Sequence, residues 1–320
     1  MGEQVAQELR GSTIHGVIPP GAELPRAGRM SLGSVPSLFS LRRTALSHGW
    51  CALAPSAYDD EAVALHRTLL LPDAGPLTVT ITQRRDGRLT ASWGRVDGSC
   101  ADRVAIKAQC RHMLALDDDL TELHARCAAT PGLDWVAELG VGRLLRSPTV
   151  FEDLARTLAT TNCSWALTEL ICRRLVDSLG AVGPGGERAF PTPAEVTEAG
   201  EAHFKDVVRA GYRSRAFIEL GTAVAADAVD TDAWWDSVVP DSEVLSQVRS
   251  LRGFGPYAAE GMLGLLGRPK GLALDSWIRA KLPRLLGRDS MTDAEIAERY
   301  APLGRWAGVG LWLELTRDWF

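Results

Sequence analysis

Long apolar runs and a surplus of positive charge are both missing from this 320-residue sequence. No segment approaches the roughly 20 consecutive apolar residues that a membrane-spanning helix requires. The N-terminus also lacks a basic segment followed by an apolar block, the pattern of a secretion signal. The formal net charge of -5 argues against a basic coat over the whole surface, although a local stripe of Lys and Arg can still contact phosphate groups. We therefore expect a cytoplasmic protein that binds no membrane.

Cysteine is scarce and scattered. The six cysteines lack the compact spacing of a secreted disulfide framework, so we expect reduced thiols. Two Cys/His pairs could be drawn as zinc ligands: Cys110 with His112, and His124 with Cys127. Both pairs fall within expected helices, where Cys110 and His112 would point to different faces. The motifs of phosphate-binding loops, serine hydrolases and metalloproteases are absent as well, so we expect neither a metal nor a cofactor.

The composition predicts a soluble, globular chain, and the patterns of strands and helices along it predict the α+β class. With 46% hydrophobic and 23% charged residues, the chain is long enough for two domains, or three lobes, with substantial cores. Residues 1–35 contain several glycines and prolines with little periodicity, which predicts a mobile N-terminal arm. From residue 99 to residue 320 helical spacing dominates. The helices that we expect cover residues 101–114, 117–128, 148–160, 164–179, 193–208, 214–225, 232–238 and 292–300.

Between the arm and the helices, alternation of apolar and polar residues indicates strands. Residues 77–82 alternate before an Asp-Gly pair, and residues 88–93 follow it. Asp-Gly between two alternating runs is a strong signal for a β-hairpin. Residues 39–42 also alternate, which predicts a further strand. We therefore predict an antiparallel sheet domain over residues 36–98, packed on a helical core.

The most informative segment is a glycine-containing turn between two apolar helical patterns. Residues 241–251 have apolar side chains at helical spacing, with Asp241 as N-cap, and residues 258–266 resume the period. Between them, Gly253 and Gly255 can turn the chain sharply, and their missing Cβ atoms let backbone N–H groups approach a phosphate. A glycine pair at a helix corner is more often a plain connector than a phosphate-binding turn. The neighbouring residues must therefore distinguish the two.

Those neighbours resemble the helix-hairpin-helix DNA glycosylase superfamily, including bacterial 3-methyladenine DNA glycosylase II and 8-oxoguanine DNA glycosylase. A Gly/Pro-containing segment follows the hairpin, and residues 274–279 are similar to the family's segment that carries a catalytic aspartate, here Asp275. Residues 114–119 are similar to the linker of bacterial 3-methyladenine glycosylases. The resemblance implies a helical core with a DNA-binding hairpin at residues 241–266, and it covers the first hundred residues only loosely.

Two further segments are similar to those that 8-oxoguanine glycosylases use to probe DNA. Residues 158–163 look like the segment with a DNA-probing asparagine, here Asn162. Residues 211–215 look like the Gly-Tyr-Arg-x-Arg turn, which implies that Tyr212 wedges into the duplex and that Arg213 faces the unpaired partner base. Each side chain has a structural alternative: a turn aromatic, a mid-helix amide and a surface charge. Leu167 stands where those enzymes carry another base-reading arginine, which weakens any specificity for cytosine opposite the lesion.

The chemistry expected of Asp275 follows from the reaction. When a base leaves its deoxyribose, positive charge develops on the sugar, and a nearby carboxylate stabilises that transition state. The alternative is that Asp275 only caps its helix, since Asp is a preferred N-cap residue. Aromatic faces stack well on damaged bases. The candidates for the base pocket are Trp277, Trp165, Tyr300 and Trp306, together with Tyr257 and Trp312.

Tyr257 determines the expected type of reaction. Family members that also cleave the DNA backbone place a lysine there, and tyrosine cannot form the Schiff base that this cleavage needs. The resemblance thus implies a monofunctional hydrolase that leaves an abasic site, unless Lys270 or Lys281 reaches the sugar. Since no cysteine follows Cys172, the C-terminal iron-sulfur cluster of some relatives cannot form.

Two other functions stay open: a non-catalytic DNA-binding or lesion-sensing protein that keeps the hairpin, and a helical protein-interaction domain. The expected partner of the enzyme is double-stranded DNA with a damaged base, bound by a monomer in a bacterial-type cytosol and associated with the nucleoid. The cations expected to contact DNA are Arg249, Arg252, Arg268, Lys270, Arg279, Lys281, Arg284 and Arg288.

Overall fold

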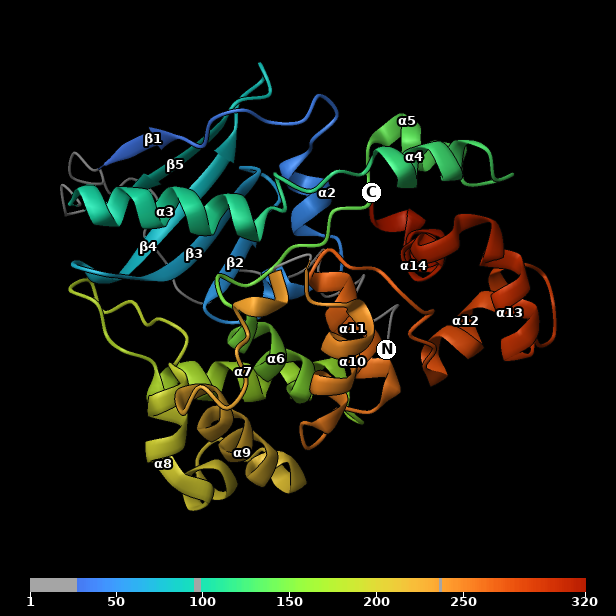
Figure 1. Ribbon diagram of the computed structural model, residues 1–320. Coiled ribbons are helices and arrows are strands. Elements are labelled where there is room, and N and C mark those ends of the chain that lie inside the picture. The colour runs from blue at the N-terminus through green and yellow to red at the C-terminus, as the bar shows by residue number, and fades with distance from the viewer. Residues whose placement is uncertain (1–27, 95–98, 236–237) are drawn as a thin grey trace.

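The computed structural model describes residues 28–94, 99–235 and 238–320. It consists of an antiparallel sheet at one end and a helical region that occupies the rest of the molecule (Figure 1). The predicted fold class, an N-terminal antiparallel sheet packed on a mainly helical core, is confirmed.

Five strands form the sheet in the order β1-β5-β4-β3-β2, with every neighbouring pair antiparallel. The strands are β1 (Arg29–Ser31), β2 (Ser56–Asp59), β3 (Ala64–Leu71), β4 (Gly75–Gln83) and β5 (Leu89–Trp93). The predicted hairpin is present as β4 and β5, and Gly87 in its turn has a φ of 82°, as the left-handed turn position requires. Helix α3 (Cys100–Met113) crosses one face of the sheet (Figure 1).

Two expectations about the N-terminal region need correction. Residues 29–31 of the predicted arm pair with β5 as the edge strand β1, while residues 1–27 lie outside the described part. The strand predicted at residues 39–42 is wrong, because helix α2 (Leu41–Ala45) begins there. The side chain of Ser40 accepts a hydrogen bond from the Arg43 N–H and caps that helix. Burial of both Phe39 and Leu41 produced the alternation that imitates a strand.

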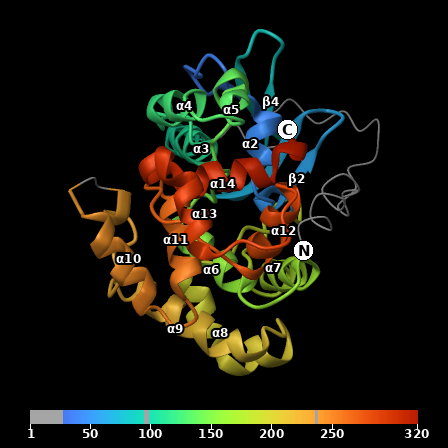
Figure 2. The same cartoon turned by 90° about the vertical axis from the view of Figure 1, so that its right-hand side faces the viewer.

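The remaining helices follow one another along the rest of the chain. They are α4 (Thr121–Ala128), α5 (Asp134–Leu139), α6 (Val150–Thr160), α7 (Trp165–Leu179), α8 (Pro193–Asp206), α9 (Ser214–Ala225), α10 (Asp241–Ser250), α11 (Pro256–Leu265), α12 (Ser276–Leu285), α13 (Asp293–Tyr300) and α14 (Ala307–Leu315). Helices α8 and α9 lie at the opposite end of the molecule from the sheet (Figures 1 and 2). Of the expected helices, residues 232–238 form only a short 3₁₀ turn at Ala233–Trp235, and residues 236–237 lie outside the described part.

Two hydrophobic clusters organise these elements. The first, which we call the sheet core, joins the sheet to α6, α7 and the helices from α8 to α11. The second, which we call the C-terminal core, is built from α4, α5 and the helices from α12 to α14. Helices α4 and α5 precede α6 in the chain, yet they pack against the last helices (Figure 1). The chain therefore crosses between the two cores more than once, and the candidate site lies where they meet.

Candidate active site

The turn between α10 and α11 adopts the hairpin that the glycine spacing predicts. Gly253 has a φ of 92°, and a Cβ atom there would approach Leu158 Cδ1 of α6 to 2.5 Å. Gly253 is thus required both by backbone conformation and by close packing. At Gly255 a Cβ atom would meet nothing within 4 Å, and no side chain caps the start of α11. The first N–H groups of α11 are therefore open to an external anion.

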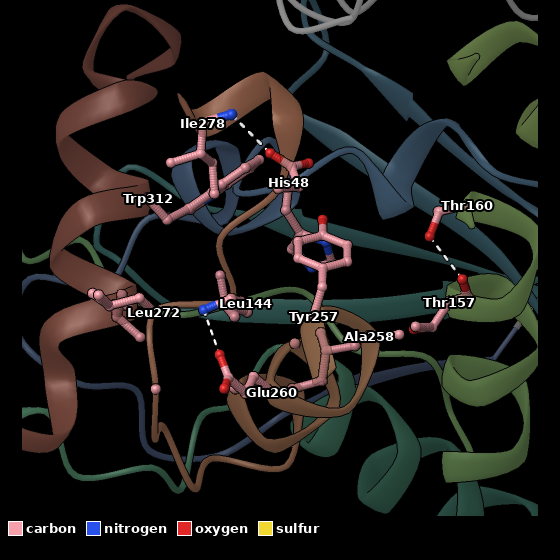
Figure 3. A pocket seen from close by; sticks show the side chains of 18 of the residues that line it. His48, Leu144, Thr157, Thr160, Tyr257, Ala258, Glu260, Leu272, Ile278 and Trp312 are labelled. Carbon is pink, nitrogen blue, oxygen red and sulfur yellow. Dashed lines mark hydrogen bonds between the residues drawn. The ribbon is translucent and has the colours of Figure 1, made fainter. Parts of the chain in front are cut away.

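A cavity of about 220 Å³ lies between the two cores, beside this hairpin. Residues of the sheet core, of α11 and of the C-terminal core all line it. Figure 3 shows Trp312 and Leu272 on one side, Thr157 and Thr160 on the other, and Tyr257 between them. The aromatic side chains in its wall are His48, Trp50, Trp165, Tyr257, Trp277, Trp312 and Trp319. Such a wall suits a planar ring.

Asp275 lines this cavity and caps helix α12 at the same time. Its Oδ1 accepts the Ile278 N–H at 2.7 Å, which fixes the orientation of the half-buried carboxylate. Oδ2 has no hydrogen-bond partner within the described part of the chain. Capping and catalysis, which were alternatives at the level of the sequence, are therefore compatible: one oxygen orients the group and the other remains available.

Helix α11 also positions the segment that carries Asp275. The Glu260 carboxylate accepts the Ala273 N–H at 2.6 Å. Ala273 has a φ of 47°, a left-handed conformation that is uncommon for alanine and needs such support. A Cβ atom on Gly271 would come within 2.5 Å of the Glu260 carboxyl carbon, so the loop lies directly against this side chain. The hairpin helix and Asp275 are thus fixed relative to each other.

Tyr257, in the first turn of α11, lies in the cavity wall with 42% of its surface exposed. The pKa of its hydroxyl is raised, first because the cavity wall desolvates it and second because Asp275 adds a negative charge nearby. The phenol therefore stays protonated at neutral pH and can donate a hydrogen bond. Of the two lysines considered, exposed Lys270 lines the cavity, whereas the Lys281 amine lies 5.0 Å from the centre of the Trp277 ring.

The predicted base-pocket aromatics separate into two pairs. Trp277 and Trp165 line the cavity, together with Trp312, whose ring centre lies 5.7 Å from that of Trp277. Tyr300 and Trp306 lie elsewhere, buried inside the C-terminal core. Tyr300 donates its hydroxyl hydrogen to Glu314, and Trp306 donates its indole N–H to Glu122 at 3.0 Å. Helical spacing could not tell these packing aromatics from the lining ones.

The predicted DNA-probing residues gather at a second place, where α6 ends. Tyr212 is 67% exposed, and its hydroxyl donates to the Thr161 carbonyl at 3.2 Å and lies 3.4 Å from the exposed Asn162 amide. Arg213 is only 4% exposed, and its guanidinium donates to the Thr161 carbonyl and, at 3.1 Å, to the Thr161 hydroxyl. Arg213 therefore supports the turn from inside, instead of facing a partner base as the sequence implied.

Half of the cations predicted to contact DNA form ion pairs within the protein. Four of the arginines form ion pairs: Arg252 with Glu219, Arg268 with Asp241, Arg279 with Asp293, and Arg288 with Glu295. Apart from Arg268, whose side chain is mostly buried, these pairs are well exposed, and exposed pairs exchange partners at low cost. A phosphate could therefore replace the carboxylate.

Sequence reasoning missed several lining residues because they lie far from the hairpin in the chain. His48 and Trp50 come from the N-terminal region, Thr157 and Thr160 from α6, and Trp319 from the C-terminal end. The one local feature that could have pointed to His48 and Trp50 as lining residues is the glycine between them. Among residues 28–94, 99–235 and 238–320, no group of three or more His, Cys, Asp or Glu side chains is placed to hold a metal ion. Over the same residues, no helix is long and apolar enough to cross a membrane.

Comparison with solved structures identifies the fold. The 3-methyladenine DNA glycosylase from Archaeoglobus fulgidus superposes with a TM-score of 0.68 and 18% identity, over 89% of this chain and 97% of the other. The 8-oxoguanine glycosylase/lyase from Clostridium acetobutylicum superposes with a TM-score of 0.67 and 15% identity, over 87% and 93%. The sequence itself matches no family model and no curated protein. The chain thus has the fold of the helix-hairpin-helix DNA glycosylases.

Proposed function

We propose that this protein is a DNA glycosylase that flips a damaged base out of the duplex, hydrolyses its N-glycosidic bond and leaves an abasic site. The observation that carries the proposal is the Asp275 carboxylate in the wall of an aromatic cavity, fixed to the helix that follows a DNA-binding type of hairpin. The cavity would hold the extruded base, and the carboxylate would lie beside its sugar.

The main contribution of Asp275 is electrostatic. As the base departs, the sugar becomes positively charged, and Oδ2 would stabilise that charge without having to reorganise, because Oδ1 already fixes the carboxylate. At about 4 Å and an effective dielectric constant of ~20, opposite unit charges attract by roughly 4 kcal/mol. This energy corresponds to about three decades in rate. The same oxygen could orient or deprotonate the attacking water.

Tyr257 supports hydrolysis without strand cleavage. A lyase reaction requires an amine that attacks the sugar carbon and forms a Schiff base. Tyr257 lies in the first turn of the hairpin helix, close enough to Asp275 for its charge to raise the pKa of the phenol, and it has no amine that could form that bond. Lys270 is the amine to test, because it lines the cavity.

Base extrusion would leave a gap that Tyr212 is placed to fill. Its ring is exposed while its hydroxyl is tied to the end of α6, so it presents an aromatic face that is already oriented. Gly253 packs against Leu158 of α6 and lies near Ala216 of α9, so the hairpin and the Tyr212 turn share the same supporting helices. The hairpin N–H groups and the wedge would then contact one stretch of duplex.

The test is base excision on duplexes that contain 3-methyladenine, 7-methylguanine, hypoxanthine, 8-oxoguanine or uracil. Products would be detected after alkaline cleavage of abasic sites. We expect release of at least one base, with strand breaks only after alkali, and duplex binding that weakens with salt. Trapping of a protein-DNA adduct by borohydride would contradict the monofunctional mechanism, and Lys270→Ala would then show whether Lys270 forms it. Salt-sensitive binding without any excision would instead favour a non-catalytic, lesion-sensing protein.

A further inference from the structure

The N-terminal region contributes His48 and Trp50 to the cavity, and the mechanism above gives His48 no role. His48 is half-buried in the cavity wall, outside the helical core that carries the hairpin and Asp275. Its Nε2 lies 2.7 Å from the Leu145 carbonyl oxygen. A carbonyl oxygen only accepts hydrogen bonds, so Nε2 carries the hydrogen, and in the neutral ring Nδ1 is then a bare acceptor.

That acceptor is unused. Nδ1 has no hydrogen-bond partner among the residues that the structure describes. It is also not closed off, because the side-chain polar atoms that are both fully buried and unpaired do not include it. Within a largely apolar wall, Nδ1 is therefore a directional group that can recognise a hydrogen-bond donor on a bound ring.

The turn that carries His48 is held from several sides. The Ser47 carbonyl accepts the Trp312 indole N–H at 2.7 Å, and the Ser47 hydroxyl accepts the Leu145 N–H at 3.0 Å. Two residues on, the Trp50 indole N–H donates to the buried Asp153 at 2.8 Å, and the Trp50 ring centre lies 4.6 Å from that of His48. The imidazole is thus pre-organised, as a group that reads a ligand must be.

Gly49 completes this arrangement. Its φ of 95° is left-handed, and a Cβ atom there would approach the Trp165 ring to 2.8 Å. The backbone between His48 and Trp50 therefore lies directly against an aromatic residue of the cavity. A shift of this backbone toward Trp165 would require the cavity wall to move.

We propose that His48 is a specificity-determining residue, whose Nδ1 accepts a hydrogen bond from an N–H group on the edge of the extruded base. The inference rests on the proposed glycosylase function and adds a substrate class to it: bases that carry an N–H donor on the edge that enters the cavity. A site built around a hydrogen bond rejects an analogue that cannot form it more strongly than an apolar pocket rejects a missing methyl group.

The protonation state agrees with this role. Burial lowers the pKa of His48 to about 4; the hydrogen bond to Leu145 opposes the shift and the charge of Arg156 adds to it. At neutral pH the ring is uncharged, so the acceptor is present throughout the range in which the enzyme would work.

The experiment compares single-turnover excision of hypoxanthine, which has a ring N–H, with that of ethenoadenine, whose corresponding edge has none. We expect the wild type to prefer hypoxanthine and His48→Phe to lower the ratio of the two rates about tenfold. His48→Gln, which keeps a donor and an acceptor, should retain more of the preference. His66→Phe is the matched control: it makes the same substitution at a half-buried histidine of β3 that bonds Thr80 and does not line the cavity, so the ratio should stay unchanged.

The outcomes separate the two proposals. A wild type that releases no base from any duplex overturns the glycosylase function itself. A wild type that releases ethenoadenine as fast as hypoxanthine, or a ratio that His48→Phe leaves unchanged, overturns only the role of His48. If His48→Phe fails to fold, inhibition of the wild type by free bases tests the role of His48 instead. Hypoxanthine should then inhibit about tenfold better than its ring-N-methyl analogue, and equal inhibition rejects the role.

Discussion

The two cores that meet at the cavity are held together in different ways. In the sheet core, Glu152 of α6 binds Arg67 of β3 at 2.5 Å and Arg156 at 2.7 Å, and all three side chains are at most 3% exposed. In the C-terminal core, Arg279 of α12 pairs with Asp293 of α13 at 2.8 Å, and both side chains are largely exposed. A buried charge cannot lose its partner cheaply, whereas an exposed one turns to water. Loss of one charge should therefore disturb the sheet core more than the C-terminal core, whose helix α12 begins at Asp275, the proposed reacting group.

The largest expected effect is that of Asp275→Asn on the rate of base excision. Asn caps a helix almost as well as Asp, so the Ile278 contact and the fold should persist. Loss of the negative charge should lower the rate of base excision by roughly two to four decades. Single-turnover kinetics on the best lesion would measure this, with thermal unfolding and duplex affinity as controls. A near-normal rate would remove Asp275 from the mechanism.

Glu152→Gln tests whether the buried ion pairs of the sheet core contribute more to stability than the exposed pair of the C-terminal core. Without the carboxylate, Arg67 and Arg156 remain buried and lose their counter-charge. Removal of one partner from a buried ion pair costs roughly 3–5 kcal/mol, which urea titration would detect as a lower free energy of unfolding. The matched control in the other core is Asp293→Asn, which should leave the urea midpoint almost unchanged. Equal effects would show that the two cores do not differ in this way.

Tyr212→Ala tests the DNA-probing turn separately from both cores, because this exposed side chain belongs to neither of them. Removal of the wedge should lower excision from duplex DNA by roughly tenfold and leave single-stranded substrates almost unaffected. The ratio of the two rates gives the measurement, and the melting temperature should stay at the wild-type value. A parallel loss on both substrates would mean that Tyr212 does not act in base extrusion.

A separate effect, on stability and not on the reaction, concerns acid sensitivity. Burial lowers the pKa of His112 to about 4, and the charge of nearby Arg146 adds to the shift; its ring packs edge-on against Trp235. The unfolded chain binds a proton at this residue below its ordinary pKa of 6.5, while the folded chain does not bind it until about 4. Stability should therefore fall as pH falls through that window, by about 1–3 kcal/mol for this side chain.

His112→Phe keeps the aromatic contact and removes the titration. Urea unfolding at pH 7 and at about pH 4.5 should thus show a smaller loss of stability for the variant than for the wild type. His48 titrates similarly and remains in both proteins, so part of the loss should persist. An identical loss in the variant and the wild type would exclude His112 as a source.

Turn residues in the sequence predicted two features of the fold correctly. The Asp-Gly turn predicted the β4–β5 hairpin, and the glycine spacing predicted the corner between α10 and α11, because both depend on backbone conformations that few residues adopt. The strand predicted at residues 39–42 failed because the Ser40 cap and the alternation point to different structures, and the cap prevailed.

The sequence alone predicted that a sheet domain precedes the helices, that a hairpin joins two of them, and that Asp275 is the candidate catalytic residue. Each prediction depends on residues that are neighbours in the chain. The tertiary structure decided the rest: that Trp277 and Trp165 line the cavity while Tyr300 and Trp306 are packed away, that Arg213 points inward, and that His48 reaches the site. The physical reason is distance along the chain. A cavity between two cores is formed by side chains that only folding brings together, and no local pattern records which face of a helix will meet it.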